Sequence, residues 1–106
     1  MPLETPTAVR RLVDATNAGD STAFLDSFTD DGVVDDWGRE FRGREAIAGW
    51  NHNENIGVHS HFTIHRVTQE GSAFAATVTV KGDGYHGDSR FTFEVAGDLV
   101  SRFTIR

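Results

Sequence analysis

Apolar residues recur at two different spacings along the 106-residue chain, and the change of spacing divides it into two halves. In the first half most of them follow the three- and four-residue spacing of helices with one buried face. In the second half they alternate with polar residues, as in strands of a half-buried sheet. The pattern predicts an α+β fold in which N-terminal helices pack on an antiparallel sheet.

Three helices are expected in the first half. The first spans 5–18, because a threonine that can cap the helix precedes a proline with a helical φ angle. A short second helix follows at 20–28, and a third begins after Gly43 and unwinds from Asn51 onward. Gly49 lowers the helix propensity of this third helix, which suggests that something packs closely against its backbone.

Short strands are expected on either side of a turn at Gly38, and four longer strands follow the third helix. The six predicted strands are 33–36, 39–42, 58–67, 73–81, 89–95 and 99–106. The short, glycine-containing links between the last four favour an antiparallel meander.

Alternation assigns the two faces of this meander. The face expected to meet the helices carries Phe62, Ile64, Phe74, Ala76, Val78, Val80, Phe91, Phe93, Val95, Phe103 and Ile105. The opposite face carries His59, His61, Thr63, His65, Thr77, Thr79, Arg90, Thr92, Glu94, Arg102 and Thr104. Its threonine content favours a surface half-covered by a second copy of the chain, a homodimer, over a fully solvated face.

Composition restricts the functions open to this chain. Its length suits a single domain over 1–106. Ten Lys and Arg against sixteen Asp and Glu give a net charge of -6, which disfavours nucleic acid as a partner. There is no cysteine, and no apolar run approaches the roughly 20 residues that span a bilayer, so we expect a cytoplasmic protein with no membrane partner and no cofactor.

Three sequence motifs carry a resemblance to a known family. They are Asn17-Ala18-Gly19-Asp20, the stretch from Phe28 to Asp36, and Phe41-Arg42-Gly43-Arg44-Glu45-Ala46-Ile47. With the order of elements, they resemble the nuclear transport factor 2-like (NTF2-like) superfamily, in particular its SnoaL-like and ketosteroid isomerase-like branch. The resemblance implies a cone-shaped, cystatin-like fold with one small-molecule pocket. Members use this pocket for isomerase, cyclase, dehydratase or epoxide hydrolase chemistry, or for no known catalysis.

The resemblance implies that Asp36 occupies the position of a carboxylate that moves a proton next to a carbonyl. The residue pattern agrees, because Asp36 is two residues from the apolar Val34 and so faces inward on a regular strand. Burial raises the pKa of a carboxylate, as a general base requires. The alternative is a strand-end carboxylate bonded to a turn or to an arginine such as Arg39.

The resemblance does not extend to the donors that stabilise an oxyanion in steroid isomerases. Leu12 stands at the position of the family's phenol, and Ser89 at that of its protonated carboxylic acid. Since one oxyanion donor is worth about 3 to 4 kcal/mol of barrier, we expect no ketosteroid isomerase activity. Leu12 and Ser89 then become pocket positions, with the Ser89 hydroxyl a weak donor.

Aromatic residues complete the expected ligand site. Trp37 lies beside Asp36 and Trp50 on the pocket side of the third helix, where each offers an apolar wall and one N–H donor; core packing is the alternative. Tyr85 lies in a glycine-rich segment that either folds over the pocket mouth or forms a plain mobile hairpin.

Two histidines, His59 and His61, have a spacing that can bind a metal. They are expected to face outward among threonines, so no metal site is predicted. A bulge in this strand is the one way in which His61 would turn inward and add an acid–base group.

Two functions follow from these residues. In the first, the chain is an enzyme in which Asp36 moves a proton of a small, mostly apolar, possibly ring-containing ligand, in isomerase, dehydratase or cyclase chemistry. In the second, it is a ligand-binding or dimerisation module that uses the same pocket without turnover.

Overall fold

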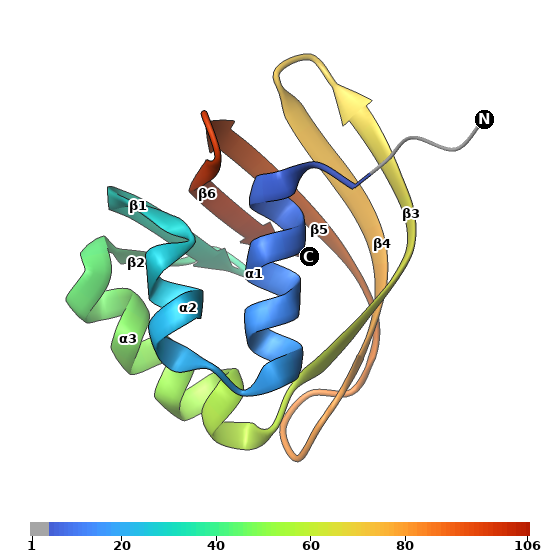
Figure 1. The fold of residues 1–106 in the computed structure, drawn as a ribbon. Helices are drawn as coiled ribbons and strands as arrows, with labels where there is room; N and C mark the ends of the chain where they lie inside the picture. Colours follow the sequence, from blue (N-terminus) through green and yellow to red (C-terminus); the bar gives the residue numbers. More distant parts are fainter. Residues whose placement is uncertain (1–4) are drawn as a thin grey trace.

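The structure, a computed structural model, describes residues 5–106, in which helices lie across one face of a curved sheet (Figure 1). The helices are α1 (Thr7–Ala18), α2 (Ser21–Asp26) and α3 (Gly43–Glu54), with a short 3-10 helix η1 (Ile56–Val58). The strands are β1 (Phe28–Asp36), β2 (Arg39–Arg42), β3 (His61–Glu70), β4 (Ala73–Lys81), β5 (Gly87–Ala96) and β6 (Leu99–Ile105). No helix in this range is long and apolar enough to cross a membrane.

The first two helices form close to where the sequence predicts them, but Pro6 rather than Thr5 precedes α1 as its cap, without a side-chain hydrogen bond, and α2 ends at Asp26 rather than at residue 28. α1 ends at Gly19, whose φ of 69° is the left-handed conformation that glycine adopts at low cost. Asp20 caps α2, because its side chain accepts a hydrogen bond of 3.0 Å from the N–H of Ala23. The apolar side of α1 is fully buried against the sheet, which fixes this helix over the middle of the fold.

The sheet has six strands in the order β2-β1-β6-β5-β4-β3 and is mixed rather than purely antiparallel. β1 begins at Phe28, five residues before the predicted start, and its far end runs parallel to β6 with Asp36 opposite Ile105. This pairing joins the predicted strand pair to the meander. It also places the end of β1, with Asp35 and Asp36, beside the C-terminal end of β6.

β3 contains a register shift between Ile64 and Arg66. Because a bulge moves later side chains to the other face, Val67 as well as Ile64 packs against the core. The shift comes after His61, so it does not turn that histidine inward: Phe62 is buried and His61 is exposed.

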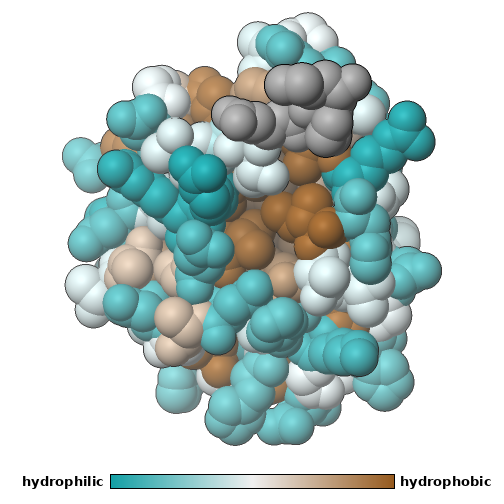
Figure 2. Space-filling view, turned by 45° about the vertical axis from the view of Figure 1, so that its right-hand side comes forward, coloured by the Kyte–Doolittle hydropathy of each residue, from teal (hydrophilic) through white to brown (hydrophobic). Residues whose placement is uncertain are grey.

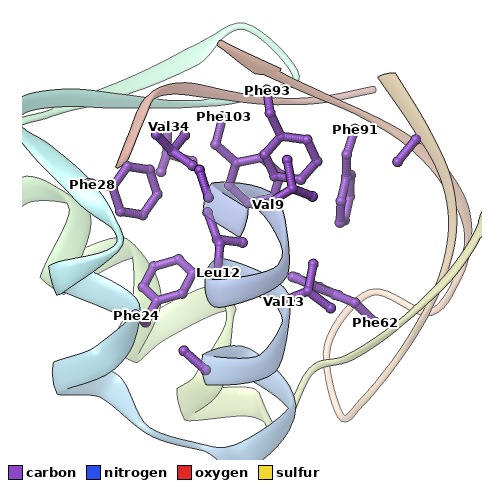
Figure 3. Close-up of a cluster of buried hydrophobic side chains, with 14 of the residues drawn as sticks. Val9, Leu12, Val13, Phe24, Phe28, Val34, Phe62, Phe91, Phe93 and Phe103 are labelled. Atoms are coloured by element: carbon purple, nitrogen blue, oxygen red, sulfur yellow. The ribbon is translucent and has the colours of Figure 1, made fainter. Parts of the chain in front are cut away.

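An aromatic cluster fills the space between α1 and the sheet (Figure 3). Phe93 and Phe103 stack with ring centroids 5.1 Å apart, and Phe91 meets Phe103 edge-on at 4.9 Å. Figure 2 shows one face on which apolar side chains reach the surface between hydrophilic neighbours. The core is therefore dense at its centre and open in places at its margin.

Two expectations about α3 are wrong. The helix continues through Glu54, because the side-chain amides of Asn51 and Asn55 bond to each other and to their neighbours at the end of the helix. Gly49 has open space where a Cβ would lie, whereas a Cβ on Gly57 would lie 1.5 Å from the carbonyl oxygen of His52. The close backbone approach is thus at Gly57, where the chain leaves the helix.

Candidate functional site

A cavity of about 220 Å³ opens between the end of α3, the β1–β2 turn and the inner face of the sheet. Its apolar lining comes from Trp37, Trp50, Phe62, Val80, Phe91 and Ile105, and its polar lining from Asp36, Arg39, Glu54, Asn55, Ser60, Tyr85 and Ser89. Most of its surface is apolar, and its polar groups lie mainly on the side of α3 and the β1–β2 turn. This is the composition of a small-molecule site.

Asp36 lies on this cavity with its side chain 15% exposed. Its Oδ2 accepts a hydrogen bond of 3.1 Å from Trp50 Nε1 and another of 2.5 Å from Arg39. No donor within residues 5–106 reaches its Oδ1. One carboxylate oxygen is therefore fixed by the protein, and the other is left for an occupant of the cavity.

Arg39 lies between two carboxylates. Besides Asp36, it contacts both oxygens of Glu54, at 2.6 and 3.0 Å. The hydrogen bond to Glu54 and the nearby charge of Asp36 raise the pKa of Arg39 above its ordinary value. The guanidinium also lies 5.6 Å from the centroid of the Phe41 ring, a cation–π distance. Arg39 is thus a permanent cation that ties β1 and β2 to the end of α3.

Trp50 belongs to both the core and the cavity. It is 3% exposed, stacks on Phe24 at 6.2 Å and meets Phe103 edge-on at 6.2 Å, while its Nε1 reaches Asp36. Trp37 and Tyr85 are instead 65% and 59% exposed and line the mouth. Trp37 has a φ of 54°, an uncommon conformation for a bulky residue, because it forms the tight turn between β1 and β2.

Leu12 and Ser89, which the resemblance places at oxyanion-donor positions, lie apart. Leu12 is fully buried in the aromatic core and is not among the residues that line the cavity. Ser89 does line it, but its hydroxyl donates to the backbone carbonyl of Arg106 at 2.8 Å. Neither residue offers the cavity a free donor.

The sequence-based prediction did not include four polar residues of the site: Arg39 as a lining group, Glu54, Asn55 and Ser60. A usable signal existed for Glu54, because a residue four positions after Trp50 shares its helix face. This signal does not apply if the helix is expected to unwind at Asn51, before Glu54. Nothing in the local pattern marks Ser60, which reaches the site by way of η1.

On the opposite face of β1, Asp35 is the centre of a second polar network. Arg102 and Arg106 contact its carboxylate at 2.8 and 3.1 Å, and the N–H of Gly38 donates to it at 2.8 Å. These partners, Arg106 foremost, lower the pKa of Asp35 to about 2 despite its burial. The network holds the end of β1, where the neighbouring Asp36 faces the cavity.

The histidines lie outside the cavity. His59 pairs with Asp83 at 2.7 Å on the surface, and His65 bonds to Thr79 at 2.6 Å on the outer face of the sheet. Within residues 5–106 no three acidic, histidine or cysteine side chains gather closely enough to hold a metal ion.

Solved structures share this fold at low sequence identity. A candidate polyketide cyclase from Sinorhizobium meliloti superposes with a TM-score of 0.86 at 23% identity, covering 96% of this chain and 95% of that one. A Mycobacterium tuberculosis protein in complex with estradiol-17β-hemisuccinate gives 0.81 at 16%, covering 92% and 88%. A computationally designed 17-OHP binder gives 0.83 at 18%, covering 93% and 86%.

No curated protein matches the chain. The family model described as the SnoaL-like domain, however, matches residues 9–106, which is nearly the whole sequence. With the cavity and the six-stranded sheet in place, the chain belongs to the SnoaL-like domain family and has its NTF2-like fold.

Proposed function

We propose that the cavity binds a small, mostly apolar, ring-containing ligand and that Asp36 accepts a proton from it. The observation that carries the proposal is the geometry of the Asp36 carboxylate, which lies on a mostly apolar cavity with Oδ2 bonded to Trp50 and Arg39 and with no donor from residues 5–106 at Oδ1. A base held in one orientation by two donors needs little reorganisation when it takes a proton.

Relatives with this fold support the ligand class. The Mycobacterium tuberculosis protein holds an estradiol ester, and the designed protein is a 17-OHP binder. Both molecules are built on an apolar ring system. These two relatives therefore support a ligand with an apolar ring system.

A second candidate function, ligand binding without turnover, is favoured by Arg39. Arg39 already forms an ion pair with Asp36 Oδ2, and transfer of a proton to this carboxylate would give up that ion pair. The Trp50, Tyr85 and Ser89 donors of the lining are bonded to protein acceptors, so few donors remain for a developing oxyanion, which limits chemistry next to a carbonyl.

The test begins with fragments and uses Trp50 as the reporter. The indole N–H resonance of Trp50 is followed by NMR while ring-containing fragments are added, and each hit is then monitored for conversion across a pH series. We expect hits to shift this resonance and Asp36→Asn to abolish conversion. Asp98→Asn is the control, because Asp98 is exposed in the β5–β6 turn, at the other end of β5 from Ser89.

Three outcomes separate the candidates. Conversion that follows the titration of one group and is lost in Asp36→Asn supports the enzyme. Binding without conversion supports the second candidate. Hits that are unaffected by Asp36→Asn, or no hit at all at Trp50, would contradict the assignment of this site.

We further propose that the outer face of the sheet pairs two copies of the chain. The support is its half-polar surface, in which Thr92 and Thr104 face each other across β5 and β6. Sedimentation equilibrium checks this: a homodimer is expected, and Thr104→Arg, which places a charge between the copies, should yield monomers. A monomer at all concentrations would reject the pairing.

A further inference from the structure

The hydrogen bonds around the cavity indicate which polar group its ligand carries. We infer that the occupant presents a hydrogen-bond donor, a hydroxyl or a protonated amine, to Asp36, and that ligands with only a carbonyl or a carboxylate are disfavoured. The inference rests on the proposed function and deepens it, because it names the ligand class of the same site.

The first step is that three donors of the lining are already engaged. Trp50 Nε1 donates to Asp36, the Ser89 hydroxyl to the carbonyl of Arg106, and the Tyr85 hydroxyl to the carbonyl of Asp88 at 2.8 Å. A carbonyl or carboxylate that enters the cavity needs such donors, and each one would first have to leave its protein acceptor.

Asn55 adds an acceptor rather than a donor. The backbone N–H of Ile56 donates to Asn51 Oδ1, which fixes the orientation of the Asn51 amide. Asn55 must then donate to the same oxygen, at 3.0 Å, and its second amide hydrogen goes to Thr16 at 3.3 Å. Asn55 lines the cavity and is 1% exposed, and its Oδ1 is the amide atom that has no partner within residues 5–106.

The charges of the lining residues also favour a ligand that carries a donor. Asp36 and Glu54 bring two negative charges and Arg39 one positive charge, which leaves one negative charge beside the cavity. An anionic ligand is therefore repelled, whereas a hydroxyl or an ammonium group is attracted to the free Oδ1 of Asp36.

Few lining donors remain in the described part of the chain. The Ser60 hydroxyl makes no hydrogen bond within residues 5–106 and is accessible, but it can accept as well as donate. The indole N–H of Trp37 lies on the exposed rim. Arg39 has N–H groups beyond those bonded to the carboxylates, and it is the group through which an acidic ligand would compete.

The cavity also limits the size of the ligand. At about 220 Å³ it is smaller than the roughly 300 to 1,000 Å³ of typical drug-sized sites. A pair of fused rings is therefore a suitable probe, with its polar group at Asp36 and its far edge toward Trp37 and Tyr85.

The experiment compares four naphthalenes that differ only in this polar group. Dissociation constants of 2-naphthol, 2-naphthylmethylamine, 2-acetylnaphthalene and 2-naphthoate are measured at neutral pH by calorimetry and by the NMR shift of the Trp50 indole N–H. We expect the naphthol and the amine to bind at least about tenfold more tightly than the ketone and the carboxylate. A hydrogen bond to a charged acceptor contributes enough binding free energy for such a difference in affinity.

Variants test the cause of the ranking. Asp36→Asn places an amide donor where Oδ1 was, so the ketone should gain on the naphthol. Glu54→Gln removes one negative charge and leaves Arg39 a single carboxylate partner, so the naphthoate should gain most. Asp98→Asn, the same kind of change far from the cavity, should keep the wild-type order.

Each result has one interpretation. If the ketone or the carboxylate binds the wild-type protein as well as the naphthol and the amine do, the inference is wrong and the proposed function stands. If none of the four shifts Trp50, the proposed function fails, and the inference fails with it. The wild-type ranking decides the matter even where a variant does not fold.

Discussion

At the scale of single residues, the site depends on a tryptophan that packs with one part of its ring system and donates with another. Trp50 is buried among Phe24, Phe41 and Phe103, yet its one polar atom is bonded to Asp36. The aromatic contacts alone would hold the ring in the core. Its N–H is what fixes the carboxylate, so core packing and site geometry are coupled through one side chain.

Trp50→Phe should therefore lower the free energy of unfolding by about 2 kcal/mol, because it removes a hydrogen bond to a partly buried charged group as well as ring volume. Trp37→Phe is the matched control and should change stability by less than about 0.5 kcal/mol, since this side chain is 65% exposed. Urea unfolding of the two variants checks this. Equal losses would mean that the bond between Trp50 and Asp36 does not stabilise the fold.

Which residues the sequence could reveal follows from the range of each interaction. Asp36 can be predicted because its alternation with Val34 is a local signal. Trp50 can be predicted because the spacing of apolar residues along a helix is also a local signal. The pairing of Arg39 with Glu54 joins residues 15 apart and depends on where a helix ends. No local period encodes that contact, so a competing arginine was foreseen for Asp36 but the second carboxylate was not.

At the scale of elements, the end of α3 fixes the positions of Glu54 and Asn55 in the cavity lining. Asn51 and Asn55 continue the helix by bonding to each other, and they reach Ser21 and Thr16 on the other helices. The chain then turns so closely past the helix that only a glycine fits at position 57.

Two glycines of this segment give a matched pair of predictions. Gly57→Ala should destabilise the protein by about 3 kcal/mol, because its Cβ would overlap the carbonyl of His52. Gly49→Ala should stabilise it by roughly 0.5 to 1 kcal/mol, since the helix gains propensity and the new methyl meets no atom within 4 Å. Thermal unfolding of both variants distinguishes them, and a shift of the same sign in both would refute this account of the helix end.

Most helices and strands could be predicted from the sequence, but the pairing of β1 with β6 could not. α1, α2 and the antiparallel strands follow from periodicity and turn residues. The parallel pairing of β1 with β6 brings together residues about 70 apart, for which the periodicity holds no signal. The extra strand length before Val33 follows from the same pairing, because the N–H of Val100 bonds to the carbonyl of Ser27.

At the scale of the whole molecule, β1 carries two adjacent carboxylates that serve opposite faces of the sheet. Asp36 faces the cavity, and Asp35 faces the outer surface, where Arg102 and Arg106 hold it. Since the two are neighbours on one strand, the outer network sets the position of the strand end from which Asp36 projects. The face proposed for dimerisation and the cavity are therefore mechanically linked.

The pairing of Asp35 with Arg102 and Arg106 makes the stability of the fold depend on pH in the acidic range. The pKa of Asp35 is lowered from 3.8 to about 2, chiefly by its hydrogen bond with Arg106, so the folded state binds this proton less readily than the unfolded state. A depressed pKa contributes stability that is fully present above about pH 4 and disappears as the pH falls through about 2. The contribution is at most about 2 kcal/mol, because Arg106 is half exposed and solvent screens part of the interaction.

Urea unfolding of the wild type and Asp35→Asn at pH 7, 4, 3 and 2 measures this contribution. The difference in free energy between the two should be constant from pH 7 to about 4 and should shrink toward zero at pH 2. Glu45→Gln, which changes an exposed carboxylate on α3, should show no such convergence. A difference that stays constant down to pH 2 would show that the pairing of Asp35 with its two arginines is not what stabilises the end of β1.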